Sequence, residues 1–129
     1  MKTYLLDTQA ILYWLSGNKK LGRGARKVME DSRNELLVSV VSSWEIGIKY
    51  ALGKMTLPES PERYLPRRFQ EHAFTLITLE HMEALAAAAL PLHHDDPFDR
   101  ALIAQANARK AVLVSGDSAF EDYAVRTVW

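Results

Sequence analysis

The chain has 129 residues, 48% of them apolar and 25% charged, a composition that suits one globular domain over residues 1–129. It lacks cysteine, which excludes disulfides and thiolate metal sites, and its longest apolar run, residues 84–90, is far shorter than the ~20 residues that span a bilayer, so we expect a cytoplasmic protein. Sixteen basic and sixteen acidic side chains cancel, which argues against a general polyanion-binding module but leaves open a nuclease with local cations.

Short β-favouring apolar runs alternate with segments of helical periodicity along the chain. Strands are predicted at residues 3–6, 36–41, 75–78, 111–114 and 125–129. Helices are predicted at residues 10–15, 21–32, 62–72 and 80–90, and two more begin near residues 43 and 97. This alternation predicts an α/β fold: a single three-layer α/β/α sandwich around a central, mostly parallel sheet of about five strands.

The helix after the second strand is expected to begin at Ser42 or Ser43, as the N-cap. Glu45 would then stand in the first turn, where the helix dipole favours a carboxylate. The apolar stripe that packs this helix is predicted to comprise Trp44, Ile48, Leu52 and Met55.

The helix near residue 97 carries an unusual acid. Asp95 or Asp96 suits the N-cap, and Pro97 suits the first helical position, where its missing N–H costs nothing. At about 100° per residue, Asp99 falls inside the apolar arc that Leu102 and Ala106 define. A carboxylate on that face needs a partner, because burying it unpaired costs several kcal/mol.

Four acids stand at the ends of strands or the starts of helices, positions that would bring them together at one edge of a parallel sheet. Asp7 follows the first strand and Asp117 follows the fourth, while Glu45 and Asp99 lie near helix starts. Asp96 is a neighbour of Asp99 on one helix face. Converging carboxylates repel one another unless a hard cation binds them, and one or two Mg²⁺ or Mn²⁺ ions would suit such oxygen ligands. Such a site can hydrolyse phosphodiester bonds without a side-chain nucleophile.

Each acid also has a purely structural interpretation, as a helix cap, a first-turn residue or a turn residue. An aspartyl-phosphate phosphatase would need a second acid where Gln9 stands, and the lysine of a receiver domain is not found. The adjacent His93 and His94 are not expected to share one ion, because neighbouring side chains on an extended segment point opposite ways. His72 and His81 are expected at or near the surface.

Four segments together resemble a known family: residues 4–8 (YLLDT), 42–46 (SSWEI), 96–106 (DPFDRALIAQA) and 115–117 (SGD). In order and spacing they resemble a PIN-domain ribonuclease, and more closely the VapC-type toxins of bacterial type II toxin–antitoxin pairs. The resemblance covers essentially the whole chain. It implies a cytoplasmic endoribonuclease dependent on Mg²⁺ or Mn²⁺, which forms homodimers and is inhibited by a cognate antitoxin protein.

The resemblance assigns roles residue by residue. Asp7, Glu45, Asp99 and Asp117 would be the catalytic, metal-binding acids, with Asp96 as a further metal-binding carboxylate nearby. Thr8 and Ser115 would orient ligands or water, and Arg100 would either offer its charge to a phosphate or form an outward ion pair. Gly116 departs from the pattern, because relatives often carry a basic residue there. A catalytically inactive RNA- or protein-binding module of the same fold is the alternative, and its expected mark, the loss of an acid, is absent.

Overall fold

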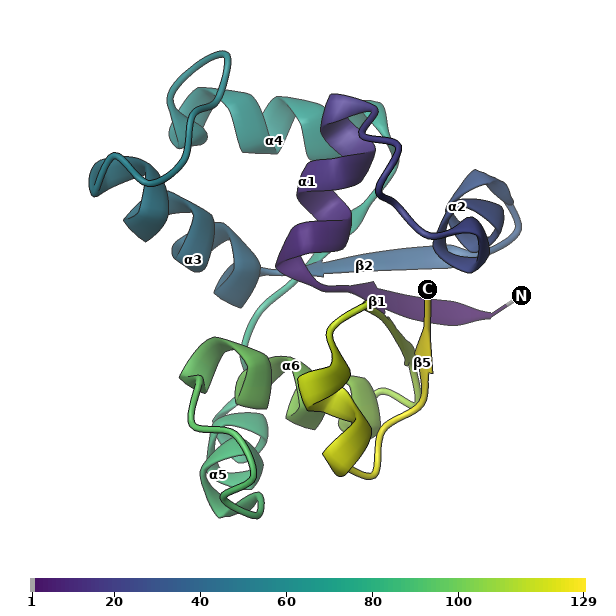
Figure 1. The fold of residues 1–129 in the computed structure, drawn as a ribbon, viewed down its shortest axis with the longest axis vertical. Helices are drawn as coiled ribbons and strands as arrows, with labels where there is room; N and C mark the ends of the chain where they lie inside the picture. Colours follow the sequence, from purple (N-terminus) through teal and green to yellow (C-terminus); the bar gives the residue numbers. More distant parts are fainter. Residues whose placement is uncertain (1) are drawn as a thin grey trace.

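A computed structural model describes residues 2–129 of the chain (Figure 1). In chain order its elements are β1 (Thr3–Leu6), α1 (Thr8–Ser16), α2 (Arg23–Glu30), β2 (Glu35–Ser39), α3 (Val40–Ala51), α4 (Pro61–Glu71), β3 (Thr75–Ile77), α5 (His81–Ala89), α6 (Pro97–Ala108), β4 (Val112–Val114), a 3-10 turn η1 (Ser118–Asp122) and β5 (Thr127–Val128). None of the helices in this part of the chain is long and apolar enough to span a bilayer.

The five strands form one sheet in the order β3-β2-β1-β4-β5, and every neighbouring pair is parallel. The strand β1 lies at the centre, where the chain first builds outward through β2 and later returns to the other side with β4. The α/β fold with a parallel five-stranded sheet, expected from the sequence, is therefore confirmed.

Helices cover both faces of the sheet and make two hydrophobic cores (Figure 1). Side chains of α1, α2, α3 and α4 pack on one face, and those of α6 and η1 pack on the other. Alternate residues of β1 supply both cores, since Tyr4 and Leu6 join the first and Leu5 joins the second. Burial on both faces explains why the inner strands β1, β2 and β4 are largely apolar, whereas the edge strands β3 and β5 are partly exposed.

The predicted start of α3 is wrong, because neither Ser42 nor Ser43 is its N-cap. The second strand ends at Ser39, not at residue 41, and Ser39 is the N-cap of α3, where its hydroxyl accepts a hydrogen bond from the Val41 amide at 3.0 Å. Val40 and Val41 are helical although β-branched residues favour strands, because the cap and tertiary packing override this weak preference. Glu45 consequently lies in the second turn of α3. The other elements begin and end within two residues of the predicted positions.

The predicted apolar stripe of α3 is also wrong. The helix buries Val41, Ser42, Glu45 and Ile46, whereas Trp44 is 66% and Leu52 63% exposed. The buried face is thus the one that carries Glu45, and Trp44 instead packs edge-on against Phe98 of α6, with ring centroids 5.2 Å apart. The helix is positioned by a face that is partly polar, which an apolar stripe does not reveal.

Candidate active site

The acidic residues meet in one cleft at the carboxyl ends of β1 and β4. These two strands are neighbours although one begins the chain and the other comes near its end, so the strand order reverses between them. Open α/β sheets bind ligands at such a reversal. The cleft has a volume of about 490 Å³, and its lining includes all five of the acids singled out in the sequence: Asp7, Glu45, Asp96, Asp99 and Asp117. Their metal-binding role stays a prediction.

Asp7 is the most deeply placed of these acids, at 7% exposed. It is the N-cap of α1, and its Oδ1 accepts a hydrogen bond from the Ala10 amide at 2.7 Å. Burial is the main cause that raises the pKa of Asp7 to about 6, and the negative charges of Asp99 and Asp117 add to the effect. Hydrogen bonds from the Ser115 hydroxyl and the Ala10 amide oppose it. The surroundings of Asp7 therefore disfavour its charged form, which is the form in which a carboxyl binds a cation.

Glu45 reaches the cleft from the second turn of α3. Its Oε1 accepts a 2.6 Å hydrogen bond from the Thr8 hydroxyl, and its Oε2 lies 3.0 Å from the Lys49 ammonium. The Thr8 Oγ1 also lies 3.1 Å from the Ser42 Oγ. Thr8 thus orients an acid of the cluster, while Lys49 brings one of the cations of the cleft.

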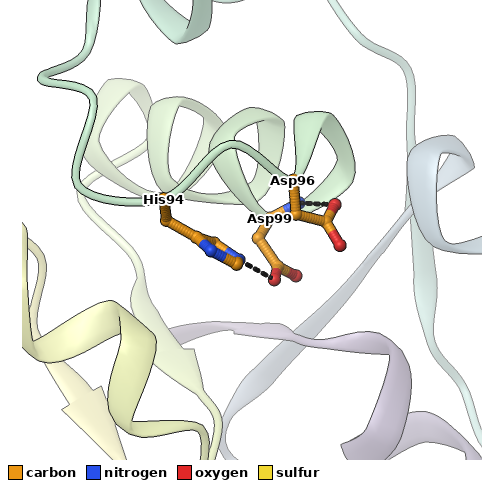
Figure 2. Close-up of side chains that lie close together, drawn as sticks. All are labelled: His94, Asp96 and Asp99. Carbon is orange, nitrogen blue, oxygen red and sulfur yellow. Dashed lines mark hydrogen bonds and ion pairs between the residues drawn. The ribbon is translucent and has the colours of Figure 1, made fainter.

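Asp96 and Asp99 open α6, and His94 stands beside them (Figure 2). Asp96 is the N-cap, with its Oδ1 accepting from the amides of Phe98 at 2.8 Å and Asp99 at 3.2 Å. The Nε2 of His94 lies 2.8 Å from the Oδ2 of Asp99. One ligand atom from each of the three residues lies within 4.8 Å of the others, which is a spacing that fits a metal ion.

The pair of His94 and Asp99 is electrostatically matched. Burial raises the pKa of Asp99, and the hydrogen bond from His94 opposes that rise. The same hydrogen bond raises the pKa of His94. Asp99 therefore has the partner that its position on the buried face of α6 requires.

Asp117 lies just beyond β4, at the N-cap of η1, where its Oδ1 accepts from the Ala119 amide at 2.9 Å. The buried Ser115 hydroxyl accepts from the Asp117 amide at 3.1 Å. Since the Ser115 side chain also donates to Asp7, it links two of the acids. Among residues 2–129, ion pairs within 4.0 Å involve Glu45 and Asp99 but none of Asp7, Asp96 and Asp117.

Arg100 does not contact the cleft, which contradicts the expected phosphate contact. The side chain is buried, and its guanidinium donates hydrogen bonds to the Ala88 carbonyl in the last turn of α5 and to three carbonyls of the segment between α5 and α6: those of Leu90, Pro91 and His94. A cation whose donors are occupied in this way stabilises the segment that carries His94. These hydrogen bonds of the guanidinium give Arg100 a structural role.

Several residues in or beside the cleft are not identified by the sequence analysis. His94 was set aside with its neighbour, and nothing local indicates that a residue before the N-cap turns back onto Asp99. The spacing of Lys49 four residues after Glu45 is a usable signal, because such residues are neighbours on a helix. No signal marks the remaining lining residues as parts of this cleft: Gln9, Leu12, Tyr13, Lys20, Met55, Gly116 and Trp129.

Known proteins resemble this chain in sequence and in fold. Ribonuclease VapC16 from Mycobacterium tuberculosis is 38% identical over 56 residues, which make up 43% of this chain and 40% of that protein. The structure of VapBC2 from Rickettsia felis bound to a promoter DNA fragment matches with a TM-score of 0.69 and 15% identity, covering 97% of this chain and 96% of that one. DNA-bound VapBC from Salmonella typhimurium matches with a TM-score of 0.69 and 17% identity, covering 98% and 97%.

The structural matches establish the fold, at identities too low to carry more. The sequence match to a whole family is broader, because the PIN domain family matches residues 4–126, a range that runs from β1 through η1 and contains all five acids of the cleft. The chain belongs to the PIN domain family.

Proposed function

We propose that this protein is a metal-dependent endoribonuclease, the toxin of a toxin–antitoxin pair. The observation that carries the proposal is the convergence of five carboxylates, from elements far apart in the sequence, in one cleft of a PIN domain. The partial relative is a ribonuclease by name. RNA is the proposed substrate, and the cytoplasm is the proposed site of action.

The donor set fits a hard divalent cation. Asp7 is buried and Asp99 half-buried, and besides burial the charges of other acids raise both pKa values: Asp99 and Asp117 act on Asp7, and Asp96 and Glu45 act on Asp99. Full ionisation of the cluster is therefore unfavourable without positive charge. Carboxylate oxygens are the ligands that Mg²⁺ and Mn²⁺ prefer. We propose that Asp7, Asp99 and Asp117 bind one or two such ions, and that Glu45 and Asp96 contribute from the flanks.

The chain's own side chains position the ligands and leave room for the substrate. Thr8 fixes Glu45, the Ala10 amide fixes Asp7, and His94 fixes Asp99 through the contacts described above. When bound, a divalent ion supplies an activated water at neutral pH and stabilises negative charge on the leaving oxygen of an in-line displacement. Lys20 and Lys49 on the cleft lining would attract the phosphate backbone.

The proposal includes two protein partners. A toxin–antitoxin complex from Klebsiella pneumoniae is among the structures that share this fold, with a TM-score of 0.61 and 18% identity over 91% of this chain and 89% of that one. We therefore propose that a cognate antitoxin inhibits this chain. The homodimer that the family resemblance implies would be completed by a second copy of the chain.

The test is cleavage of purified ribosomal and transfer RNA. The wild-type protein, Asp7→Asn and Asp99→Asn are compared in about 5 mM Mg²⁺ or Mn²⁺, a concentration that suits weakly bound ions, and in EDTA. We expect the wild type to cut only with the ions, and each variant to lose at least about a hundredfold in rate, since each removes a ligand charge. Asp122→Asn, an exposed acid outside the cleft lining, is the matched control.

Circular dichroism checks that all variants fold. Cleavage that persists in EDTA, or that survives in folded Asp7→Asn and Asp99→Asn, refutes the proposed site. Binding of RNA without cleavage by the wild type would instead favour the inactive binding module.

A further inference from the structure

The cleft has an apolar part that metal binding and phosphodiester chemistry do not use. Besides the acids and two lysines, its lining includes Leu12 and Tyr13 of α1, Met55 after α3, and Trp129 after β5. All four are half-buried, so part of each packs on the first hydrophobic core while part faces the cleft. A nucleotide has the same division, because an anionic phosphate is joined to a flat, weakly polar base.

Trp129 is fixed in place by two glycines. A Cβ built on Gly116 would lie 2.6 Å from both Cε2 and Nε1 of the Trp129 indole, so the ring lies directly against the backbone next to Asp117. The Gly24 amide, at the start of α2, donates to the Trp129 carbonyl at 3.0 Å. Ring and backbone are thus both held, which lowers the entropy lost when a ligand binds against the indole.

The second aromatic ring of the cleft stands beside the first. The ring centroids of Tyr13 and Trp129 are 6.2 Å apart, with their planes tilted by 46°. The absence of a side chain at Gly116 leaves the space beside Asp117 to the indole. The exposed Lys20 lines the same cleft, so a cation accompanies the aromatic pair.

We propose that Trp129, with Tyr13, forms a stacking site for an unpaired nucleobase adjacent to the scissile phosphate. The inference rests on the proposed ribonuclease activity and adds its substrate class: single-stranded RNA, such as a loop, whose bases can leave the helical stack. Stacking on aromatic rings tolerates any base, because every base has a π-face. The acids and their ions would take the phosphate while the indole positions the neighbouring base.

The test measures binding without cleavage. In an Asp99→Asn background with Mg²⁺, fluorescence anisotropy compares a labelled uridine decamer with a decamer of the same ribose-phosphate backbone that lacks bases. We expect Trp129→Leu to weaken binding of the uridine decamer about tenfold or more, and to leave binding of the abasic decamer unchanged. Trp44→Leu is the matched control, since this exposed tryptophan does not line the cleft.

Tyr13→Leu provides a second variant with the same expected pattern, and circular dichroism confirms that the variants used are folded. Equal affinity of Trp129→Leu and its parent for the uridine decamer overturns the stacking site alone, if the wild type cuts RNA. An equal loss for both decamers also overturns it, because the indole would then act only through the shape of the cleft. If the wild type neither binds nor cuts RNA, the proposed function fails and the stacking site with it.

Discussion

At the scale of single residues, Asp7 shows the cost of the acidic site most clearly. Its pKa is raised to about 6, whereas an unfolded chain would titrate near the ordinary value of 3.8. Between these two values the folded state binds a proton that the unfolded state has released. The free energy of unfolding therefore falls as the pH rises through this window, and the penalty is complete above it.

We predict that Asp7→Asn stabilises the metal-free protein at pH 7.5. The expected gain is on the order of 1–3 kcal/mol, because asparagine is an equally good N-cap and carries no charge. Urea unfolding in EDTA at several pH values between 4 and 7.5 measures it, as the difference between the variant and the wild type. That difference should grow up to pH 6 and then level off.

The exposed Asp122 supplies the control, since Asp122→Asn should leave the pH dependence of unfolding unchanged. Parallel curves for Asp7→Asn and the wild type would contradict the assignment of the raised pKa to Asp7.

His94 stands beside the cleft and contacts Asp99, one of its acids. If it orients Asp99 for metal binding, His94→Ala should raise the Mg²⁺ concentration needed for half-maximal RNA cleavage by about 10–100-fold. His94→Gln keeps a donor near the Oδ2 of Asp99 and should recover part of the loss. The exposed His81 provides the control variant His81→Ala. An unchanged Mg²⁺ requirement in His94→Ala would leave the contact in Figure 2 without a functional role.

At the scale of elements, the segment between α5 and α6 depends on one side chain. The guanidinium of Arg100 bonds four carbonyls of residues 88–94, and the Tyr123 hydroxyl donates to the Pro91 carbonyl as well. Residues 90–94 have no regular structure, and the Ala88 carbonyl lies in the last turn of α5, so these bonds satisfy polar groups that a helix or strand does not satisfy internally here.

We predict that Arg100→Leu lowers the free energy of unfolding by about 3 kcal/mol, because several half-buried carbonyls lose their donors at once. Urea unfolding measures the loss, and Arg126→Leu, at an exposed arginine, should change it by no more than about 0.5 kcal/mol. A loss in Arg100→Leu as small as that of the control would show that water replaces the guanidinium.

The sequence predicts elements better than it predicts their faces. The inner strands β1, β2 and β4 are recognisable because they are buried on both sides, and α6 is recognisable because Asp96 and Pro97 form a clear start signal. The predicted start of α3 is wrong because Val40 and Val41 extend the apolar pattern of the strand. Its predicted packing face is wrong because Glu45 is buried whereas Trp44 is exposed. Those facts depend on contacts with Thr8 and Phe98, which are remote in sequence.

The same reasoning applies to the cleft. The acids could be predicted because each stands at an element end that a parallel sheet turns toward one edge. Trp129, Tyr13 and Lys20 could not, because no periodicity relates the start of the chain to its end. Arg100 was misassigned for a related reason, since an arginine in the first turn of a helix has no local pattern that distinguishes a carbonyl partner from a phosphate.

At the scale of the whole molecule, cation binding and folding are linked. The acids come from four separate parts of the fold, so the unfolded chain offers no comparable site and an ion stabilises only the folded state. At a concentration of Mg²⁺ a hundred times the dissociation constant, the stabilisation is about 2.7 kcal/mol. For a domain of this size, that corresponds to a rise in Tm of roughly 5–10 °C.

Thermal unfolding followed by circular dichroism, with and without Mg²⁺ at matched ionic strength, measures this shift. We predict a rise for the wild type and for Asp122→Asn, and none for the double variant Asp7→Asn/Asp99→Asn. An identical shift in the double variant would mean that Mg²⁺ binds elsewhere on the protein.

The central place of β1 has a consequence for how the protein is made. Because β1 pairs with β4 and Asp7 meets Asp117 only through that pairing, a chain still on the ribosome lacks a complete acidic site until β4 and η1 have emerged from the exit tunnel. A nascent chain that has β1, β2 and β3 but not yet Asp117 lacks one of the five acids and the pairing of β1 with β4, so under the proposed function it does not yet cut RNA. The order of strands in the sheet therefore delays assembly of the site until β4 and η1 have been synthesised.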